Sequence, residues 1–333
     1  MLQDVIYEKY GLIMERQETR GPYRRFYSGH NLYTIVPLGE IDEEELMERF
    51  KLSEFMQMQG DPYVSAFVMS NDRTFLCEDD DTIFVLLGNS LLEEPRPLKM
   101  GSKLARFHNR GRFFSESLKV INRIGQWKEL WESRLDAMDK IWQEKMHTHP
   151  NNEFEKMFVD SFPYFLALGE NAIQYLVDSE IDDQPSAIDA GTINHERFYT
   201  DTWTGDFLLK NPFDWVFDHH SRDISEWMRE HYRRYPHTYH PYTVQFMREY
   251  QVYNNLSSFS WRLLYARLLF PVHYLEVVEN YFSQGTLADK RRGEEVLERY
   301  LQQTGHYEDY LRHFYESHEV PIGGFRIPKV DWL

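Results

Sequence analysis

The sequence predicts an α+β protein with a small antiparallel sheet and one helix at the front of the chain, followed by a larger, mainly helical part. Two patterns predict this fold class. Short β-prone runs separated by turn residues fill the first 90 residues, and apolar residues recur every three to four positions over most of the rest. We therefore expect a sheet lobe at residues 1–90 and a helical lobe at residues 91–333.

The sheet lobe should contain one helix among short strands. Asp42 suits the N-cap of that helix, acidic residues fill its first turn, and Gly60 follows its end. Turns rich in Gly, Pro and Asn separate the strands. The expected helix is Asp42–Gln59, and the expected strands are Leu12–Arg16, Arg24–Ser28, Leu32–Leu38, Tyr63–Met69, Thr74–Glu78 and Thr82–Leu87.

The helical lobe is interrupted once, at Pro185–Val216, by two β-like runs, Ser186–Ala190 and Phe213–Val216. Polar loops that rigid elements position commonly carry function, so we expect the functional site in this interruption. The expected helices are Leu98–Asn109, Glu116–His147, Asn152–Ser179, Ile224–His231, Tyr242–Asn254, Phe259–Gln284, Leu287–Thr304 and Tyr307–Ser317.

Composition excludes several classes of partner. Lys plus Arg is 37 and Asp plus Glu is 54, for a net charge of −17, which disfavours nucleic acid and anionic membrane surfaces. Cys77 is the single cysteine, so an internal disulfide and a cysteine-based zinc site are excluded. Neither a membrane-spanning run nor a signal peptide is recognisable, so we expect a soluble protein made in the cytoplasm.

Four segments resemble those of one family of phosphotransferases. KMGSKLARFHNRGRFF (Lys99–Phe114) resembles the G-x-x-L-A-x-x-H helix that opens the large lobe of aminoglycoside-phosphotransferase and choline-kinase-like proteins. TINHERFYTDTW (Thr192–Trp203) resembles their H-G-D-x-x-x-x-N catalytic loop, and NPFDWVFDHHSRDISEWMR (Asn211–Arg229) their metal-binding segment. LLYARLLFPVHYLEVVENYF (Leu263–Phe282) is similar to a late helix of the spore-coat branch.

The resemblance implies a two-lobed, protein-kinase-like fold and a spore coat protein of the YutH type, related to the CotS coat proteins. It implies that other spore coat proteins are the partners. It also implies synthesis in the mother-cell cytoplasm and assembly into the coat.

The phosphate-binding part of this fold is altered in the sequence. Active relatives hold the phosphates with a Lys on the third strand, and a helix Glu holds that Lys. Val36 and Pro37 stand at the Lys position. Without a Lys to hold, the helix residues Glu44, Glu45 and Glu48 are expected to form a solvated face.

The catalytic loop is altered as well. His195 matches the family His, but Arg197 replaces the Asp that accepts the hydroxyl proton, and Thr202 replaces the metal-binding Asn. An arginine stays protonated and cannot act as a base. Asp214 keeps the metal position and Asp223 keeps that of a structural Asp. We expect Arg197 to pair with Asp214 and close the site.

The sequence therefore predicts a pseudokinase that acts as a structural or interaction protein and uses no cofactor. The alternative is an active small-molecule or protein kinase that uses ATP and Mg²⁺ with a relocated base. In that case Glu196 or Asp201 would replace the missing Asp, and Asp214 would hold the metal.

Two motifs indicate metal binding only weakly. Asp218-His219-His220 spells a metal-phosphoesterase motif, but the further aspartates of that motif have no counterpart except the acidic turn Asp79–Asp81. His147 and His149 end a predicted helix, where histidines commonly cap the chain.

The segment His231–Tyr242 interleaves basic and aromatic residues. We expect it to be a cationic loop that binds an acidic protein, with Tyr235 and Tyr239 as contact residues. The alternative is that its tyrosines pack back on the helical lobe.

Overall fold

The computed structural model describes residues 2–39, 42–79, 82–92, 99–203, 208–283, 286–328 and 330. The chain divides into two compact units. We call Met1–Asn122 together with Gly191–Asp218 the sheet unit, and Arg123–Ala190 together with His219–Leu333 the helical unit. The division falls at residue 122 rather than near residue 90, and the expected catalytic loop belongs to the sheet unit.

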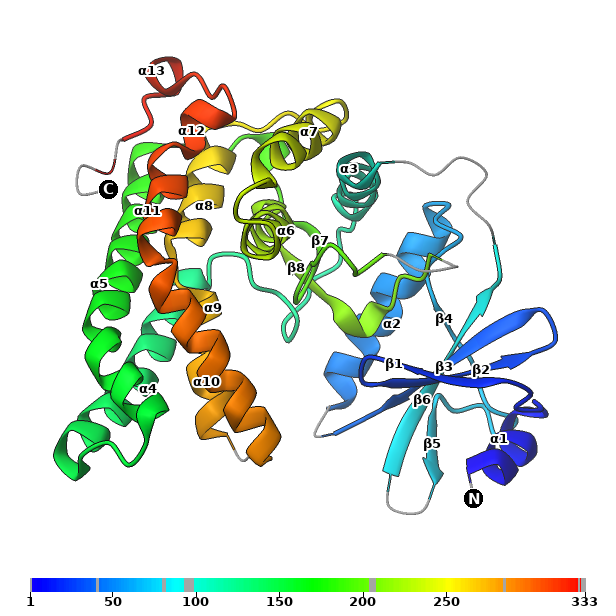
Figure 1. Cartoon of the computed structure of the whole chain (residues 1–333). Helices are drawn as coiled ribbons and strands as arrows, with labels where there is room; N and C mark the ends of the chain where they lie inside the picture. Colours follow the sequence, from blue (N-terminus) through cyan, green and yellow to red (C-terminus); the bar gives the residue numbers. More distant parts are fainter. Residues whose placement is uncertain are drawn as a thin grey trace. The chain divides into compact units, whose positions relative to one another are not determined.

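The described part of the sheet unit contains a six-stranded antiparallel sheet with the order β1-β2-β3-β6-β4, in which β5 also pairs with β6 (Figure 1). Its strands are β1 Gln17–Arg20, β2 Tyr23–Ser28, β3 Asn31–Pro37, β4 Ala66–Phe67, β5 Leu76–Asp79 and β6 Thr82–Ser90.

Each face of this sheet packs on one helix, because alternate side chains of a strand point to opposite faces. Ile6 of α1 (Leu2–Tyr10) packs with Phe26 and Phe84 on one face. Leu46 of α2 (Glu43–Met58) packs with Val85 on the other. The position of α2 therefore follows from the apolar pattern of the strands.

The sequence predicted α2 but not α1. The Asp42 side chain caps α2 as expected, accepting a hydrogen bond from Glu45 N at 2.7 Å. The expected strand Leu12–Arg16 is wrong, and the strand lies at Gln17–Arg20 instead. The last two residues of the expected strand, Glu15 and Arg16, form backbone hydrogen bonds with Tyr27 of β2.

A two-stranded antiparallel ribbon completes the sheet unit. It joins β7 (Thr192–His195) to β8 (Trp215–Asp218), and α3 (Met100–Gly111) packs against β7. A Cβ on Gly111 would lie 2.6 Å from Thr192 Oγ1, so this close approach requires glycine. The expected strand Ser186–Ala190 is wrong, since Ala187–Asp189 forms a 3₁₀ turn.

The helical unit is built around α5, which lies beside α4 and α8 (Figure 1). Its helices are α4 Trp127–Thr148, α5 Glu153–Asp182, α6 Ser221–Arg234, α7 Tyr239–Gln251, α8 Ser258–Leu269, α9 Val272–Phe282, α10 Leu287–Gln302, α11 Thr304–Arg312, α12 Phe314–Ser317 and α13 Ile322–Phe325. Among the described residues, no helix is long and apolar enough to cross a membrane.

Several expected helices have different bounds in the structure, and a glycine or a proline accounts for two of these differences. The helix expected from Glu116 begins at Trp127, because Gly125 adopts a φ of +74° just before it. The expected helix Phe259–Gln284 is divided into α8 and α9 at Pro271, which lacks the N–H that a continuous helix needs. Asp80, Asp81, Leu98 and Gln284, which fall in expected segments, lie outside the described residues.

Candidate functional site

His195 is the last residue of β7 and pairs with Trp215 across the ribbon. The residue is 1% exposed. The rings of Phe107, Phe198 and Trp203 surround it at centroid distances of 5.1, 4.9 and 5.2 Å. An aromatic shell therefore fixes His195 within the expected catalytic loop, Thr192–Trp203.

Asp214 lies next to the end of β7. It is the last residue of a 3₁₀ turn, Pro212–Asp214, and its carbonyl accepts a hydrogen bond from Glu196 N at 2.7 Å. Its carboxylate accepts a hydrogen bond from the Tyr23 hydroxyl at 2.9 Å. Tyr23 begins β2, directly after the tight Gly21–Pro22 turn. The chain itself thus supplies a partner for the one acidic residue kept at the metal position.

The surroundings of Asp214 disfavour a bare negative charge. Burial raises the pKa of Asp214, while the Tyr23 hydrogen bond and the charges of His195, Arg25 and Arg49 act in the opposite direction. Burial and the neighbouring Asp214 also raise the pKa of Tyr23. Tyr23 therefore remains a protonated donor to Asp214 at any ordinary pH.

The expected ion pair between Arg197 and Asp214 is wrong. The Arg197 guanidinium donates to the Glu196 carbonyl at 3.0 Å. Among the described residues, the carboxylate of Asp214 is hydrogen-bonded by Tyr23 and not by Arg197. Tyr23 fills the role that the sequence assigned to Arg197, because the β1–β2 turn brings it to the carboxylate.

Thr202 closes a local turn. Its Oγ1 accepts a hydrogen bond from Tyr199 N at 2.8 Å, and its own N–H donates to the Tyr199 carbonyl at 3.1 Å. The two residues weighed as relocated bases, Glu196 and Asp201, are both exposed.

Val36 makes apolar contacts at the position of the phosphate-binding Lys. It is 3% exposed in β3 and belongs to the cluster with Leu46 and Val85, on which Phe213 packs. Phe213 directly precedes Asp214. The position that would hold phosphates is therefore part of the core on the α2 face of the sheet.

Arg49 of α2 anchors the segment around Asp214. Its guanidinium donates to the carbonyls of Pro212, Phe213 and Trp215 at 3.0, 2.9 and 3.2 Å. It also pairs with Glu45 one turn earlier, at 2.6 Å. The i,i+4 spacing of Glu45 and Arg49 predicts their ion pair from the sequence. The sequence does not indicate that Arg49 binds the three carbonyls.

Glu48 contradicts the expected solvated face of α2. It is 5% exposed, and its carboxylate accepts hydrogen bonds from the backbone N–H groups of Lys119, Val120 and Ile121 at 2.5, 3.1 and 3.0 Å. Only Glu44 is exposed as expected, with its carboxylate 2.5 Å from Lys119 Nζ. Glu48 is buried because the segment before α4 presents three N–H groups to it.

A buried ion pair that the sequence did not predict fixes the chain just after the expected catalytic loop, Thr192–Trp203. Lys210 Nζ lies 2.5 Å from the carboxylate of Asp61, to which Arg110 also donates, at 2.8 Å. The Lys210 ammonium lies over the rings of Trp203 and Phe107, at 4.9 and 5.2 Å from their centroids. No residue spacing predicts this pair, since Asp61 and Lys210 are 149 residues apart.

Asp223, expected as a structural Asp, is fully buried in the first turn of α6, in the helical unit.

In the candidate metal motif Asp218-His219-His220, the ring of His219 is already bonded. Its Nδ1 lies 2.8 Å from Ser221 Oγ, and its Nε2 lies 3.4 Å from Asp189. The described residues contain no group of three or more metal-ligating side chains. His147 lies in the last turn of α4 and His149 is its C-cap residue, as expected for a helix end.

The two tyrosines expected to contact a partner differ in exposure. Tyr235 follows α6 and is 44% exposed. Tyr239 begins α7 and is half-buried, with its ring edge-on to Tyr232 and Tyr310 at 4.8 and 5.2 Å. The expected loop is mostly helix, because only residues 235–238 separate α6 from α7.

Comparison with known proteins decides the family. Residues 3–314 match the model of the family described as "Spore coat putative kinase YutH". The endospore coat-associated protein YutH of Bacillus subtilis strain 168 is 40% identical over 334 residues, covering 100% of this chain and 98% of the relative. The chain belongs to the spore coat YutH family.

Solved structures show that this member of the YutH family has the predicted kinase-like fold. The chain resembles an aminoglycoside phosphotransferase from Alicyclobacillus acidocaldarius with 12% identity and a TM-score of 0.67, covering 95% of this chain and 96% of that chain. A microcompartment-associated aminopropanol kinase matches with 11% identity and a TM-score of 0.60, covering 95% and 98%. Spectinomycin phosphotransferase in complex with ADP and spectinomycin matches with 10% identity and a TM-score of 0.59, covering 90% and 93%.

Proposed function

We propose that the chain is a coat-associated pseudokinase that acts as a structural or interaction protein in endospore coat assembly. The name of the 40% identical relative, an endospore coat-associated protein, supports a location in the coat and other coat proteins as partners. The proposal that it transfers no phosphate rests on the residues of the site.

The observation that carries the proposal is the hydrogen bond from Tyr23 to Asp214, at 2.9 Å. Mg²⁺ is held in kinase sites by carboxylate oxygens together with the phosphates of the substrate. Here the carboxylate is bonded by a hydroxyl, its pKa is raised by burial, and the positive charges of Arg25 and Arg49 act on it. Each of these properties opposes binding of a divalent cation.

The other altered positions support the same proposal. Val36 is buried among apolar residues and offers no charge to a phosphate. Arg197 cannot accept the proton of an acceptor hydroxyl. The Thr202 hydroxyl accepts a backbone hydrogen bond from Tyr199. We therefore propose that the protein works without ATP and Mg²⁺ as cofactors.

Thermal unfolding with Mg-ATP tests this proposal. We expect the same melting temperature in millimolar Mg-ATP as in Mg²⁺ alone, for the wild type and for Asp214→Asn. A ligand at a hundred times its Kd would add about 2.7 kcal/mol to the free energy of unfolding, which is easily detected. An upward shift in the wild type that EDTA and Asp214→Asn both abolish would contradict the pseudokinase and favour a kinase with Glu196 or Asp201 as the base.

Of the two tyrosines expected at the partner contact, we propose Tyr235 as the contact residue. Tyr235 is 44% exposed, and the centroid of its ring lies 5.0 Å from that of the His231 ring. Tyr239 packs between Tyr232 and Tyr310, so its replacement would disturb the helical unit itself.

A further inference from the structure

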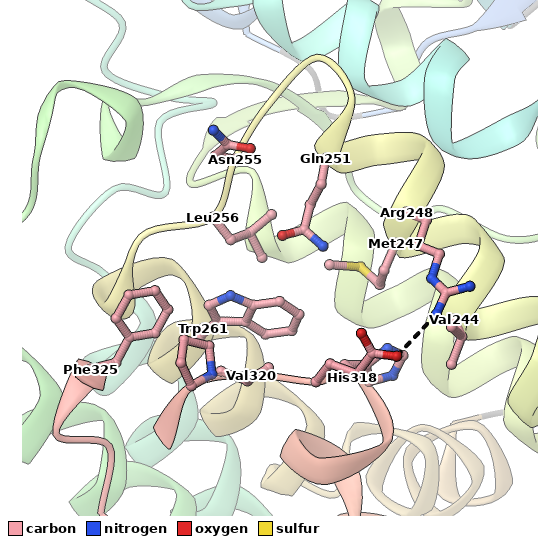
Figure 2. A pocket seen from close by; sticks show the side chains of 12 residues that line it. Val244, Met247, Arg248, Gln251, Asn255, Leu256, Trp261, His318, Val320 and Phe325 are labelled. Carbon is pink, nitrogen blue, oxygen red and sulfur yellow. Dashed lines mark hydrogen bonds and ion pairs between the residues drawn. The ribbon is translucent and has the colours of Figure 1, made fainter. Parts of the chain in front are cut away.

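The helical unit holds a pocket of about 460 Å³, lined by α7, the start of α8 and the segment from α12 to α13 (Figure 2). This volume is in the usual range of sites that bind small molecules or a few residues of a peptide. None of the residues of the degenerate kinase site lines the pocket.

The floor of this pocket is apolar. Met247, Leu256, Trp261 and Val320 line it and are at most 8% exposed, and the half-buried ring of Phe325 lies at one end. Figure 2 shows the Met247 thioether pointing toward the Trp261 indole. Such a floor fits a large aliphatic or aromatic side chain.

Two amide side chains line the pocket above this floor. The half-buried Gln251 amide points toward Trp261 in Figure 2 and makes no hydrogen bond with any described residue. Asn255 supplies a second amide, which also has no bonded partner in the described chain. An amide side chain both donates and accepts, so these two groups match the N–H and C=O of a peptide main chain.

The arginine at the rim of the pocket, Arg248, already forms an ion pair with a carboxylate of the chain, that of Glu319. Arg248 pairs with Glu319 at 3.0 Å, and their side chains are 69% and 78% exposed (Figure 2). Exposed pairs of this kind contribute little, so another carboxylate can replace Glu319 at small cost. Glu319 also has a φ of +56°, a conformation that is unfavourable for a residue with a side chain.

We propose that this pocket binds the carboxyl-terminal residue of a partner polypeptide. The last side chain, aliphatic or aromatic, lies on Trp261, the terminal carboxylate binds Arg248 in place of Glu319, and Gln251 bonds the main chain. The volume and the second amide, Asn255, favour a chain end over a free amino acid, which would fill only part of the pocket. This inference names a partner for the interaction role proposed above and so rests on it.

Calorimetric titration of the full chain with acetyl-Ala-Ala-Ala-Leu tests the proposal. We expect saturable binding of the free acid and binding about twofold to fivefold weaker for its carboxamide and for Arg248→Met, because each change removes one side of a solvent-screened charged pair. Glu319→Gln, which removes the competing carboxylate, should tighten binding about twofold to fivefold. The matched control is Arg312→Met, which breaks an exposed pair with Asp309 on α11 and should change nothing.

The proposal would be overturned by no saturable binding of the free acid, by equal binding of the acid and the carboxamide, or by equal affinities of Arg248→Met and Arg312→Met. Free leucine that binds as tightly as the peptide would assign the pocket to amino acids and refute the chain-end partner. Melting curves in Mg-ATP on the same samples report separately on the pseudokinase proposal, so failure of one is distinguishable from failure of the other.

Discussion

At the scale of single residues, the site is defined by the bond between Tyr23 and Asp214. The hydroxyl donates to the carboxylate at 2.9 Å across 191 residues of sequence. Because burial raises the pKa of Asp214, the ionised carboxylate depends on this donor and on the nearby positive charges. Tyr23 thus donates a hydrogen bond to the acidic residue that the sequence predicts at the metal position.

Replacement of Tyr23 by Phe removes the donor and leaves the Asp214 carboxylate without its hydrogen bond. We expect the free energy of unfolding at pH 7 to fall by about 1–3 kcal/mol, the usual cost of leaving a largely buried acceptor unbonded. Urea unfolding measures this change. Tyr33→Phe is the matched control, since the Tyr33 ring stacks on Phe26 at 5.2 Å and its hydroxyl makes no hydrogen bond among the described residues. Equal losses in the two variants would show that the Tyr23 hydroxyl contributes nothing.

At the scale of elements, α2 is held at two neighbouring positions. Arg49 binds three carbonyls around Asp214, and Glu48 binds three N–H groups before α4. In active relatives, the corresponding helix offers a Glu to the phosphate-binding Lys. Here the helix instead binds the backbone of Pro212–Trp215 through Arg49 and the backbone of residues 119–121 through Glu48.

Glu48→Gln should destabilise the sheet unit because an amide oxygen carries no charge and the amide NH₂ cannot accept from the third N–H group. We expect a loss of about 2–3 kcal/mol in the free energy of unfolding, as for hydrogen bonds to a charged group. Glu44→Gln, on the same helix, breaks only an exposed, solvent-screened pair with Lys119 and should change the free energy of unfolding little. Chemical denaturation of both variants measures the free energy of unfolding. If Glu44→Gln lowers it as much as Glu48→Gln does, the anchoring role of Glu48 is contradicted.

At the scale of the whole molecule, buried histidines make stability depend on pH. Burial lowers the pKa of His318 to about 4, holds that of His273 well below its usual value and also lowers that of His231. The unfolded chain takes up these protons below about pH 6.5, whereas the folded chain does so only at lower pH. The stabilisation from neutral burial is therefore complete above pH 6.5 and is lost as the pH falls.

We expect the free energy of unfolding to fall between pH 7.5 and pH 5, with about 2 kcal/mol of the loss coming from His318 alone. Asp189, whose pKa several hydrogen bonds hold below its usual value, adds to the loss only at still lower pH. His318→Gln should flatten the profile between pH 7.5 and pH 5, while His237→Gln, at an exposed position, should not. Urea midpoints at a series of pH values measure this, and parallel profiles for the wild type and His318→Gln would refute it.

The sequence by itself determined the order of sheet and helices and the kinase-like fold. It also predicts which residues replace the phosphate-binding Lys, the base and the metal-binding Asn. These predictions depend on residue identity and on local periodicity, both of which are readable along the chain. The sequence failed where helix or strand propensity was overridden locally, as at α1 and at the 3₁₀ turn Ala187–Asp189.

Only the tertiary structure decided what occupies the site. The partner of Asp214 is Tyr23 and not Arg197, Glu48 is an anchor rather than part of a solvated face, and Arg49 is a second anchor. Their targets are mostly backbone carbonyl and N–H groups, which every residue carries, so no sequence pattern marks them. Contacts across 71 to 191 residues depend on how the sheet, α2 and the β7–β8 ribbon pack, and that packing is a property of the folded chain as a whole.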